Sequence, residues 1–258
     1  MDHLTRLLAS TRARVEESKI KVPVEGLEQR LASVDRPRGF GDALRGGGIS
    51  LIAEIKRATP SRGVLNLGLD AGDLAASYSL GGAAALSVLT EPDEFRGSLD
   101  DLAATRAVGL PTLRKDFIID DYQVLESRAA DADAILLIVR ALEDEALSSL
   151  LKAAEVLGLD AVVEVHDAPE LDRALQAGAS IIAVNHRDLT TFRIDPDRTA
   201  KLAPGVPDDA LLISLSGVES RDDVEYLESA GADAVLVGES LVLAHDPAEK
   251  VRELLGRA

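Results

Sequence analysis

Residues 49–65 read ISLIAEIKRATPSRGVL, and this segment decides the fold that we predict. Side chains alternate across a β-strand, so Ile52 and Glu54 project to one face and Leu51 to the other. Both faces carry apolar residues, which is typical of a parallel strand covered on both sides. Burial of Glu54 and Lys56 is unfavourable unless they are paired or line a wet cavity. We therefore expect this strand to end at a pocket.

Similar apolar, β-branched runs recur along the chain. With the first, they occupy residues 49–56, 83–90, 111–117, 134–140, 160–166, 181–186, 210–216 and 234–238. Segments with helical spacing of apolar residues lie at 74–80, 99–108, 122–130, 142–157, 169–177, 196–202, 221–230 and 247–255. Eight strand–helix units predict an α/β fold, a (β/α)8 TIM barrel, for which about 250 residues is typical. A doubly wound open sheet stays possible because spacing does not show closure, although no G-x-G-x-x-G follows the first strand.

Polar and glycine residues mark several boundaries of the predicted helices. Asp167, Asp195 and Ser220 stand where a side chain can cap the start of a helix. Gly178 and Gly231 stand where glycine often ends one.

The first 45 residues lie outside the repeated units. Residues 4–17 and 27–34 are predicted to be helices that precede the first strand and cap one end of the barrel. No Gly/Ser linker or low-complexity tract separates a second domain. We expect a single (β/α)8 barrel domain over residues 1–258, with residues 1–45 as an N-terminal helical extension capping it.

Composition excludes several classes of function. The chain has no cysteine, which excludes disulfides, thiolate chemistry and Cys-based metal sites. A formal net charge of −17 repels nucleic acid and anionic membranes, so an anionic substrate needs a local positive site. The amino-terminal sequence lacks the apolar core of a signal peptide, and no apolar run reaches about 18 residues. We expect a cytoplasmic protein that binds neither nucleic acid nor membrane.

Charged and polar residues stand at the carboxyl ends of the predicted strands. They are Glu54 and Lys56, Lys115 and Asp116, Glu164 and His166, Asn185 and Arg187, and Ser216 and Gly217. In a barrel these ends form one rim, where charged residues are typical of catalysis. A solvated strand end explains any single one of them equally well. For His166 and His186 we expect solvated side chains rather than ligands.

Two glycine-containing loops predict a phosphate site. Ser216 and Gly217 follow the seventh strand, and Gly238, Glu239 and Ser240 follow the eighth, where a short helix can begin. Loops after strands seven and eight of a barrel, together with a helix amino terminus, form a recurrent phosphate site. Either glycine alone is more often a simple turn.

At these residues, and over nearly its whole length, the chain resembles the indole-3-glycerol phosphate synthase family. The segments that carry the resemblance are AEIKRATPSRG, ALSVLTEPDEFRGS, LRKDFIIDDYQVLESRAA, VVEVHD, VNHRDL, SGV and GADAVLVGESL. The resemblance implies a (β/α)8 enzyme of tryptophan biosynthesis. It implies ring closure of 1-(2-carboxyphenylamino)-1-deoxyribulose 5-phosphate, with loss of CO2 and water and without metal or organic cofactor.

The resemblance also implies roles for individual residues. Lys115 is expected to be the general acid on the ketone, Lys56 the second catalytic lysine, Glu164 the proton-transfer carboxylate and Glu54 the partner that orients Lys56. Asn185, Arg187, Phe95, Phe117 and Ser61 are expected to bind the substrate, and Ser216, Gly217, Gly238, Glu239 and Ser240 its phosphate. Attack of an electron-rich ring carbon on a ketone needs an acid, and the later steps need an acid and a base, which these residue types supply.

The chain departs from the family at Leu215, where a glutamate normally precedes the Ser-Gly pair of the seventh strand. By strand alternation Leu215 shares a face with Leu211 and Ile213 and points into the barrel mouth. We expect weakened rather than absent activity, since Lys115, Lys56 and Glu164 remain.

The sequence leaves other functions open. Another sugar-phosphate barrel enzyme would keep the phosphate site, but it would commonly use Asp or Cys as its acid and base. A lysine beside the apolar Leu215 could instead form a Schiff base with carbonyl compounds, as in an engineered or repurposed barrel. A phosphate binder without turnover is the remaining alternative. We expect a monomer or weak homodimer that takes a small sugar phosphate.

Overall fold

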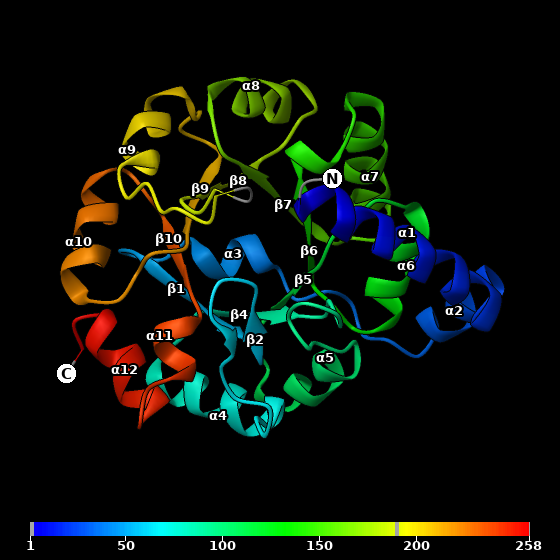
Figure 1. Ribbon diagram of the computed structural model, residues 1–258, viewed down its shortest axis with the longest axis horizontal. Helices are drawn as coiled ribbons and strands as arrows, with labels where there is room; N and C mark the ends of the chain where they lie inside the picture. The colour runs from blue at the N-terminus through cyan, green and yellow to red at the C-terminus, as the bar shows by residue number, and fades with distance from the viewer. Residues whose placement is uncertain (1–2, 189–190, 258) are drawn as a thin grey trace.

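The computed structural model describes residues 3–188 and 191–257, and within them eight parallel strands close into a barrel (Figure 1). The strands are β1 (Ser50–Ile55), β4 (Ala85–Leu89), β5 (Thr112–Lys115), β6 (Ala134–Ile138), β7 (Asp160–Val165), β8 (Ile181–Asn185), β9 (Leu211–Leu215) and β10 (Ala234–Val237). Their order around the ring is β1-β10-β9-β8-β7-β6-β5-β4. The first strand pairs with both β10 and β4, so Ile52 lies opposite Leu236 on one side and Ala85 on the other. The predicted strands and the closed TIM barrel are confirmed, and the open sheet is excluded.

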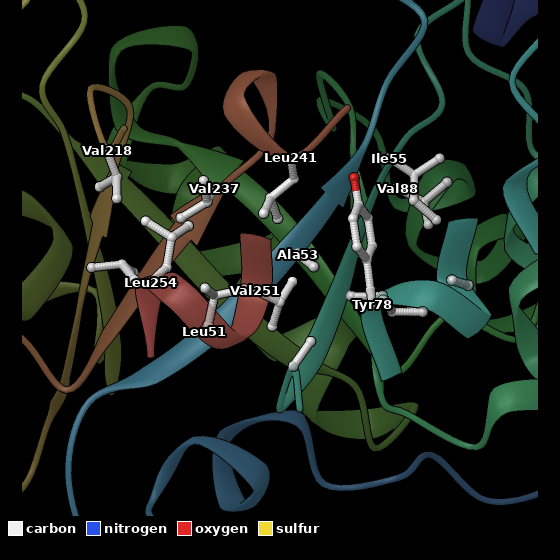
Figure 2. Close-up of a cluster of buried hydrophobic side chains, with 14 of the residues drawn as sticks. Leu51, Ala53, Ile55, Tyr78, Val88, Val218, Val237, Leu241, Val251 and Leu254 are labelled. Carbon is white, nitrogen blue, oxygen red and sulfur yellow. The ribbon is translucent and has the colours of Figure 1, made fainter. Parts of the chain in front are cut away.

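The alternation predicted for the first strand is also confirmed. Ile52 faces the barrel interior, where it packs in one cluster with Leu215 and Leu236. Leu51, Ala53 and Ile55 face outward into a different cluster. Figure 2 shows this outer layer, with Tyr78, Leu241 and Val251 supplied by the surrounding helices. Both faces of the strand are therefore buried, and its six residues have no solvated side.

Helices surround the barrel, and most follow the predicted segments. Their bounds are α4 (Ala71–Gly81), α5 (Asp100–Thr105), α6 (Asp121–Ala129), α7 (Asp144–Val156), α8 (Ala168–Gln176), α9 (Arg198–Leu202), α10 (Arg221–Ser229), α11 (Glu239–Val242) and α12 (Pro247–Leu254). Short 3₁₀ turns follow α5, β6 and α9, at η1 (Arg106–Val108), η2 (Val139–Ala141) and η3 (Ala203–Gly205).

Two of the predicted capping residues are confirmed and one is wrong. The side chains of Asp167 and Ser220 accept hydrogen bonds from the third residues of α8 and α10. Asp195 does not cap α9, whose N-cap is Asp197. The Asp195 carboxylate instead binds the Lys201 ammonium at 2.9 Å, because the helix begins two residues later than its sequence pattern predicts.

The segment before the first strand lies at both ends of the barrel. Helix α1 (His3–Lys21) places His3, Leu4 and Leu7 at the cavity by the carboxyl ends of the strands. It is held by Ser10, which donates to Asp93 at 2.6 Å, and by Arg14, which pairs with Glu91 at 2.8 Å. Helix α2 (Val24–Leu31) packs on α6.

A further helix, α3 (Phe40–Leu44), was not predicted from the sequence. It lies at the opposite end of the barrel, where the Gly41 N–H donates to Asp160 at the start of β7 and Phe40 is fully buried. A five-residue helix carries too little periodicity to be read from sequence alone. The hairpin of β2 (Ala58–Thr59) and β3 (Gly63–Val64) was missed for the same reason.

No helix among residues 3–188 and 191–257 is long and apolar enough to cross a membrane.

The close packing of α4 on α12 predicts a large cost for one methyl group. A Cβ at Gly81 would lie 2.6 Å from the Val251 Cβ and 2.7 Å from the Ala248 carbonyl oxygen. We expect Gly81→Ala to lower the free energy of unfolding in urea by about 1–3 kcal/mol, because two helices must separate. Gly47→Ala is the matched control, since nothing lies within 4 Å of a Cβ there. Equal stability of Gly81→Ala and Gly47→Ala would contradict this packing.

Candidate active site

A cavity of about 620 Å³ opens at the carboxyl ends of the barrel strands. Its lining includes every residue proposed for the site from sequence. These are Glu54, Lys56, Ser61, Phe95, Lys115, Phe117, Glu164, Asn185, Arg187, Leu215, Ser216, Gly217, Gly238, Glu239 and Ser240. Barrel closure thus brings together side chains that are up to 186 positions apart, from Glu54 to Ser240.

Lys56 and Glu54 form a close ion pair on the wall of this cavity. Their Nζ and Oε1 atoms are 2.7 Å apart, and both side chains are largely buried. Glu54 lies in β1 and Lys56 directly follows this strand, so the carboxylate holds the ammonium against the cavity wall. Gly238 packs on this pair, and a Cβ there would lie 2.5 Å from Glu54 Oε1. The pair therefore requires glycine at the end of β10.

A second pair is formed by Lys115 and Glu164, from β5 and β7. The Lys115 Nζ lies 3.5 Å from Glu164 Oε2, and the Asn185 amide donates to Glu164 Oε1 at 2.9 Å. Burial raises the pKa of Glu164, but the charges of Lys115 and His166 and the Asn185 hydrogen bond outweigh it, so that this pKa lies below its ordinary value. The site therefore holds an ionised carboxylate beside a cationic lysine at neutral pH.

Asn185 links Glu164 to the loops that follow β8 and β9. Its side-chain oxygen accepts from the Arg187 backbone N–H at 3.0 Å and from the Ser216 hydroxyl at 3.0 Å. The Arg187 guanidinium donates to the Phe192 carbonyl at 3.3 Å, which turns this cation toward the cavity lining. Asn185 therefore fixes the orientation of several polar groups at once.

The loop after β9 has a left-handed backbone conformation that is uncommon for serine and readily adopted by glycine. Ser216 has φ +71° and Gly217 has φ +86°, so the chain turns sharply after β9. The Ser240 hydroxyl donates to the Val218 carbonyl at 3.1 Å, which joins this turn to α11. The Glu239 carboxylate pairs with Arg62 at 2.8 Å. Backbone N–H groups, rather than the Glu239 side chain, are thus the groups suited to an anion.

The remaining predicted contacts line the walls. Phe117 is buried and Phe95 is half-buried, and both pack against the interior cluster of the barrel. Ser61 is exposed on the β2–β3 hairpin, with its hydroxyl 3.1 Å from that of Thr59.

Leu215 is buried in the apolar floor of the cavity. Its side chain is 1% exposed and packs with Leu211, Ile213 and Leu236, as its strand position predicts. It lies opposite Asn185 on β8. An apolar side chain therefore stands beside the Asn185–Glu164 hydrogen bond.

The expectation of solvated strand-end histidines is wrong for both His166 and His186, which are buried. The His186 Nε2 lies 2.8 Å from the Thr199 hydroxyl, and His166 lies between Glu164 and Glu170. Residues following a strand are often solvated, but here α8 and α9 pack over them.

Sequence reasoning did not single out the residues that α1 contributes. His3, Leu4 and Leu7 line the cavity, and the His3 ring contacts the Phe192 ring at a centroid distance of 5.2 Å. The amphipathic spacing of the helix gives its apolar face but not the surface on which that face packs. Among the described residues, no group of three or more His, Asp or Glu side chains could hold a metal ion.

Comparisons with known proteins agree with the geometry. A family model described as indole-3-glycerol phosphate synthase matches residues 4–254. An indole-3-glycerol phosphate synthase of Mycolicibacterium vanbaalenii is 48% identical over 253 residues, which cover 98% of this chain and 93% of that protein. One from Roseiflexus castenholzii is 50% identical and covers 98% of both chains.

Solved structures confirm the fold. The 3-hexulose-6-phosphate synthase of Salmonella typhimurium aligns with a TM-score of 0.62 at 19% identity, covering 81% of this chain and all of that one. Thiamine phosphate pyrophosphorylase from Pyrococcus furiosus aligns with a TM-score of 0.60 at 17% identity, covering 81% of this chain and 94% of that one. At these identities the likeness concerns the barrel alone.

The burial of His186 predicts a pH dependence of stability. Burial, together with a smaller effect of Arg198, lowers its pKa from 6.5 to about 4. Between these pH values the unfolded chain binds a proton that the folded chain does not, so stability falls as the pH drops. At pH 5 this penalty is about 2 kcal/mol. The free energy of unfolding in urea should therefore fall by about this amount between pH 7 and pH 5 in the unaltered chain. We expect this decrease to be absent in His186→Gln.

The exposed His245 provides the control for this measurement. We expect His245→Gln to keep the pH dependence of the unaltered chain. If His186→Gln also keeps it, the ring is not held neutral by burial.

Proposed function

The chain belongs to the indole-3-glycerol phosphate synthase family, and on this premise we propose how its cavity carries out the family's reaction. The reaction closes the ring of 1-(2-carboxyphenylamino)-1-deoxyribulose 5-phosphate to give indole-3-glycerol phosphate, with loss of CO2 and water. The observation that carries the proposal is the presence of two lysine–carboxylate pairs, Lys115–Glu164 and Lys56–Glu54, on the walls of one cavity. The comparisons favour this function over another sugar-phosphate enzyme, a Schiff-base catalyst and a phosphate binder without turnover.

Lys115 is the proposed general acid. Attack of the electron-rich ring carbon on the ketone places negative charge on the ketone oxygen, and an ammonium beside it supplies the proton. The Lys115 ammonium lies in the cavity 3.5 Å from the Glu164 carboxylate, which offsets part of the cost of burying its charge. Loss of CO2 then leaves the hydroxyl formed from the ketone as the next group to depart.

Glu164 and Lys56 are proposed for the proton transfers that complete the reaction. Departure of the hydroxyl needs an acid, which Lys56 supplies, and removal of the ring proton needs a base, which the Glu164 carboxylate supplies. Glu54 keeps Lys56 in place through their 2.7 Å contact. Each lysine has its own carboxylate partner, so Lys115 and Lys56 can donate their protons at different steps of the reaction.

The substrate carries a carboxylate and a phosphate, and the cavity offers positive charge for both. Lys56, Lys115, Arg62 and Arg187 line it in a chain whose net charge is −17. We place the phosphate at the backbone N–H groups of the Ser216–Gly217 turn and of the residues 238–240 that begin α11. Phe95 and Phe117 pack on the aromatic ring, and Asn185, Arg187 and Ser61 bind polar groups of the substrate.

The apolar Leu215 is proposed to weaken this activity. The family resemblance places a carboxylate at that position, and the structure places Leu215 beside Asn185 in the cavity floor. A leucine forms no hydrogen bond and leaves the nearby lysines with two carboxylates rather than three. We further propose that the chain is a single barrel domain that acts as a monomer or weak homodimer in the cytoplasm.

The direct test supplies the carboxyphenylamino-deoxyribulose phosphate and follows the fluorescence of the indole product. We expect Lys115→Met to lower kcat by about 10²- to 10⁴-fold, because general acid catalysis is lost while the methionine keeps most of the side-chain volume. Lys152→Met, an exposed lysine on α7, is the matched control and keeps full activity. Similar turnover by Lys115→Met and the unaltered chain would refute the role of Lys115.

The role of Leu215 is tested with two substitutions of nearly equal size. We expect Leu215→Glu to raise kcat/KM by about 10-fold or more, since it restores a carboxylate to the cavity, whereas Leu215→Gln adds polarity without charge and gains less. Both variants are measured in the indole fluorescence assay, with urea unfolding to report the cost of burying a polar group. If the unaltered chain already turns over rapidly and Leu215→Glu gives no gain, the apolar floor does not limit catalysis.

A further inference from the structure

A buried histidine stands directly behind Glu164. His166 follows β7, its side chain is 1% exposed, and it is not among the described residues that line the cavity. Its Nε2 lies 3.5 Å from Glu164 Oε1, and its Nδ1 lies 3.1 Å from Glu170 Oε2. The ring therefore connects the carboxylate in the cavity to a second carboxylate in the first turn of α8.

The contact with Glu170 fixes the proton on Nδ1. Glu170 accepts the His166 backbone N–H at 2.8 Å and pairs with the Arg140 guanidinium at 2.7 Å. Burial raises the pKa of Glu170, but the hydrogen bonds from His166 and Arg140 outweigh it and keep this pKa below its ordinary value. An ionised carboxylate accepts hydrogen bonds only, so Nδ1 is the donor.

The other ring nitrogen then decides the charge of His166. Nε2 is buried and has no hydrogen-bond partner, and the carboxylate oxygen nearest to it already accepts from Asn185. A neutral ring with its proton on Nδ1 would turn a lone pair toward the ionised Glu164. A ring protonated on both nitrogens turns an N–H toward it instead, and the two opposite charges attract.

The proposed reaction changes the charge next to Glu164. Lys115 is the mobile cation beside Glu164, and it becomes neutral when it gives its proton to the ketone oxygen. A buried carboxylate that loses its only cation takes up a proton and cannot then act as a base. A fixed cation on the opposite side prevents this.

We propose that His166 is a positioning residue that holds Glu164 ionised and correctly oriented after Lys115 has released its proton. The inference rests on the proposed function. The groups that face Glu164 are Lys115 from β5, Asn185 from β8 and His166 at the end of β7, and those that face His166 are Glu164 and Glu170, with Arg140 behind. His166 is not among the described residues that line the cavity, so it acts through Glu164 rather than on the substrate.

Two variants separate the charge of His166 from its shape. His166→Asn keeps a donor near Glu170 but leaves a gap beside Glu164, and His166→Gln can reach Glu164 as a neutral donor. Loss of the cation raises the pKa of Glu164, so we expect the acidic limb of the kcat–pH profile to move to higher pH by about one unit in both variants. At the plateau, kcat falls about 10-fold in His166→Asn and less in His166→Gln, while KM changes by less than about 3-fold.

The matched control is His186→Gln, because His186 is also buried and, among the described residues, forms no hydrogen bond or ion pair with Glu164. It is expected to change stability and to leave the acidic limb in place. An acidic limb that stays unchanged in both His166 variants overturns the proposal. A shift of equal size in His186→Gln overturns it too, because the effect would then be a general one of core disruption.

A measurement that needs no turnover separates this inference from the proposed function. The chain has four histidines, so nitrogen-15 NMR can follow each imidazole. We expect Glu164→Gln to change the ring nitrogen chemical shifts of His166 and to leave those of His186 and His245 in place. If this response occurs in a chain that makes no indole product, the coupling stands and the proposed function fails. If His166 does not respond, the coupling itself is absent.

Discussion

The structure depends on keeping charged side chains buried at the end of a closed apolar barrel. Glu164 is 1% exposed and Glu54 is 5% exposed, and the burial of a carboxylate is unfavourable unless a cation contacts it. Lys115 and Lys56 supply those cations from neighbouring positions on the rim. Because the strands are parallel and the ring is closed, each carboxylate meets its lysine in a fixed geometry rather than by a flexible surface contact.

The same constraint extends outward from the cavity. Asn185 and His166 contact Glu164, and Glu170 contacts His166, so residues from β8, from the turn after β7 and from α8 orient one carboxylate. Glycine at position 238 leaves the space in which Glu54 and Lys56 meet. These charged groups are therefore held by buried neighbours, while loops and α1 supply other parts of the cavity wall.

The cavity holds cations and carboxylates side by side in a strongly acidic chain. The whole chain has a net charge of −17, and the cavity lining brings Lys56, Lys115 and Arg187 together with Glu54, Glu164 and Glu239. The surrounding negative field weakens nonspecific binding of anions, so an anionic ligand depends on these local cations. Leu215 packs among apolar residues and makes this part of the cavity floor apolar.

Local alternation in the sequence determined the eight strands, the inward direction of Leu215 and the residues at the strand ends. These follow from side-chain periodicity, which each segment carries by itself. Only the tertiary structure decided that β1 pairs with β10, that Lys115 meets Glu164 across 49 positions, that α3 fills the far end of the barrel, and that His166 is buried between two carboxylates. The reason is physical: the burial of a side chain depends on what packs over it from distant parts of the chain, and no local pattern records that.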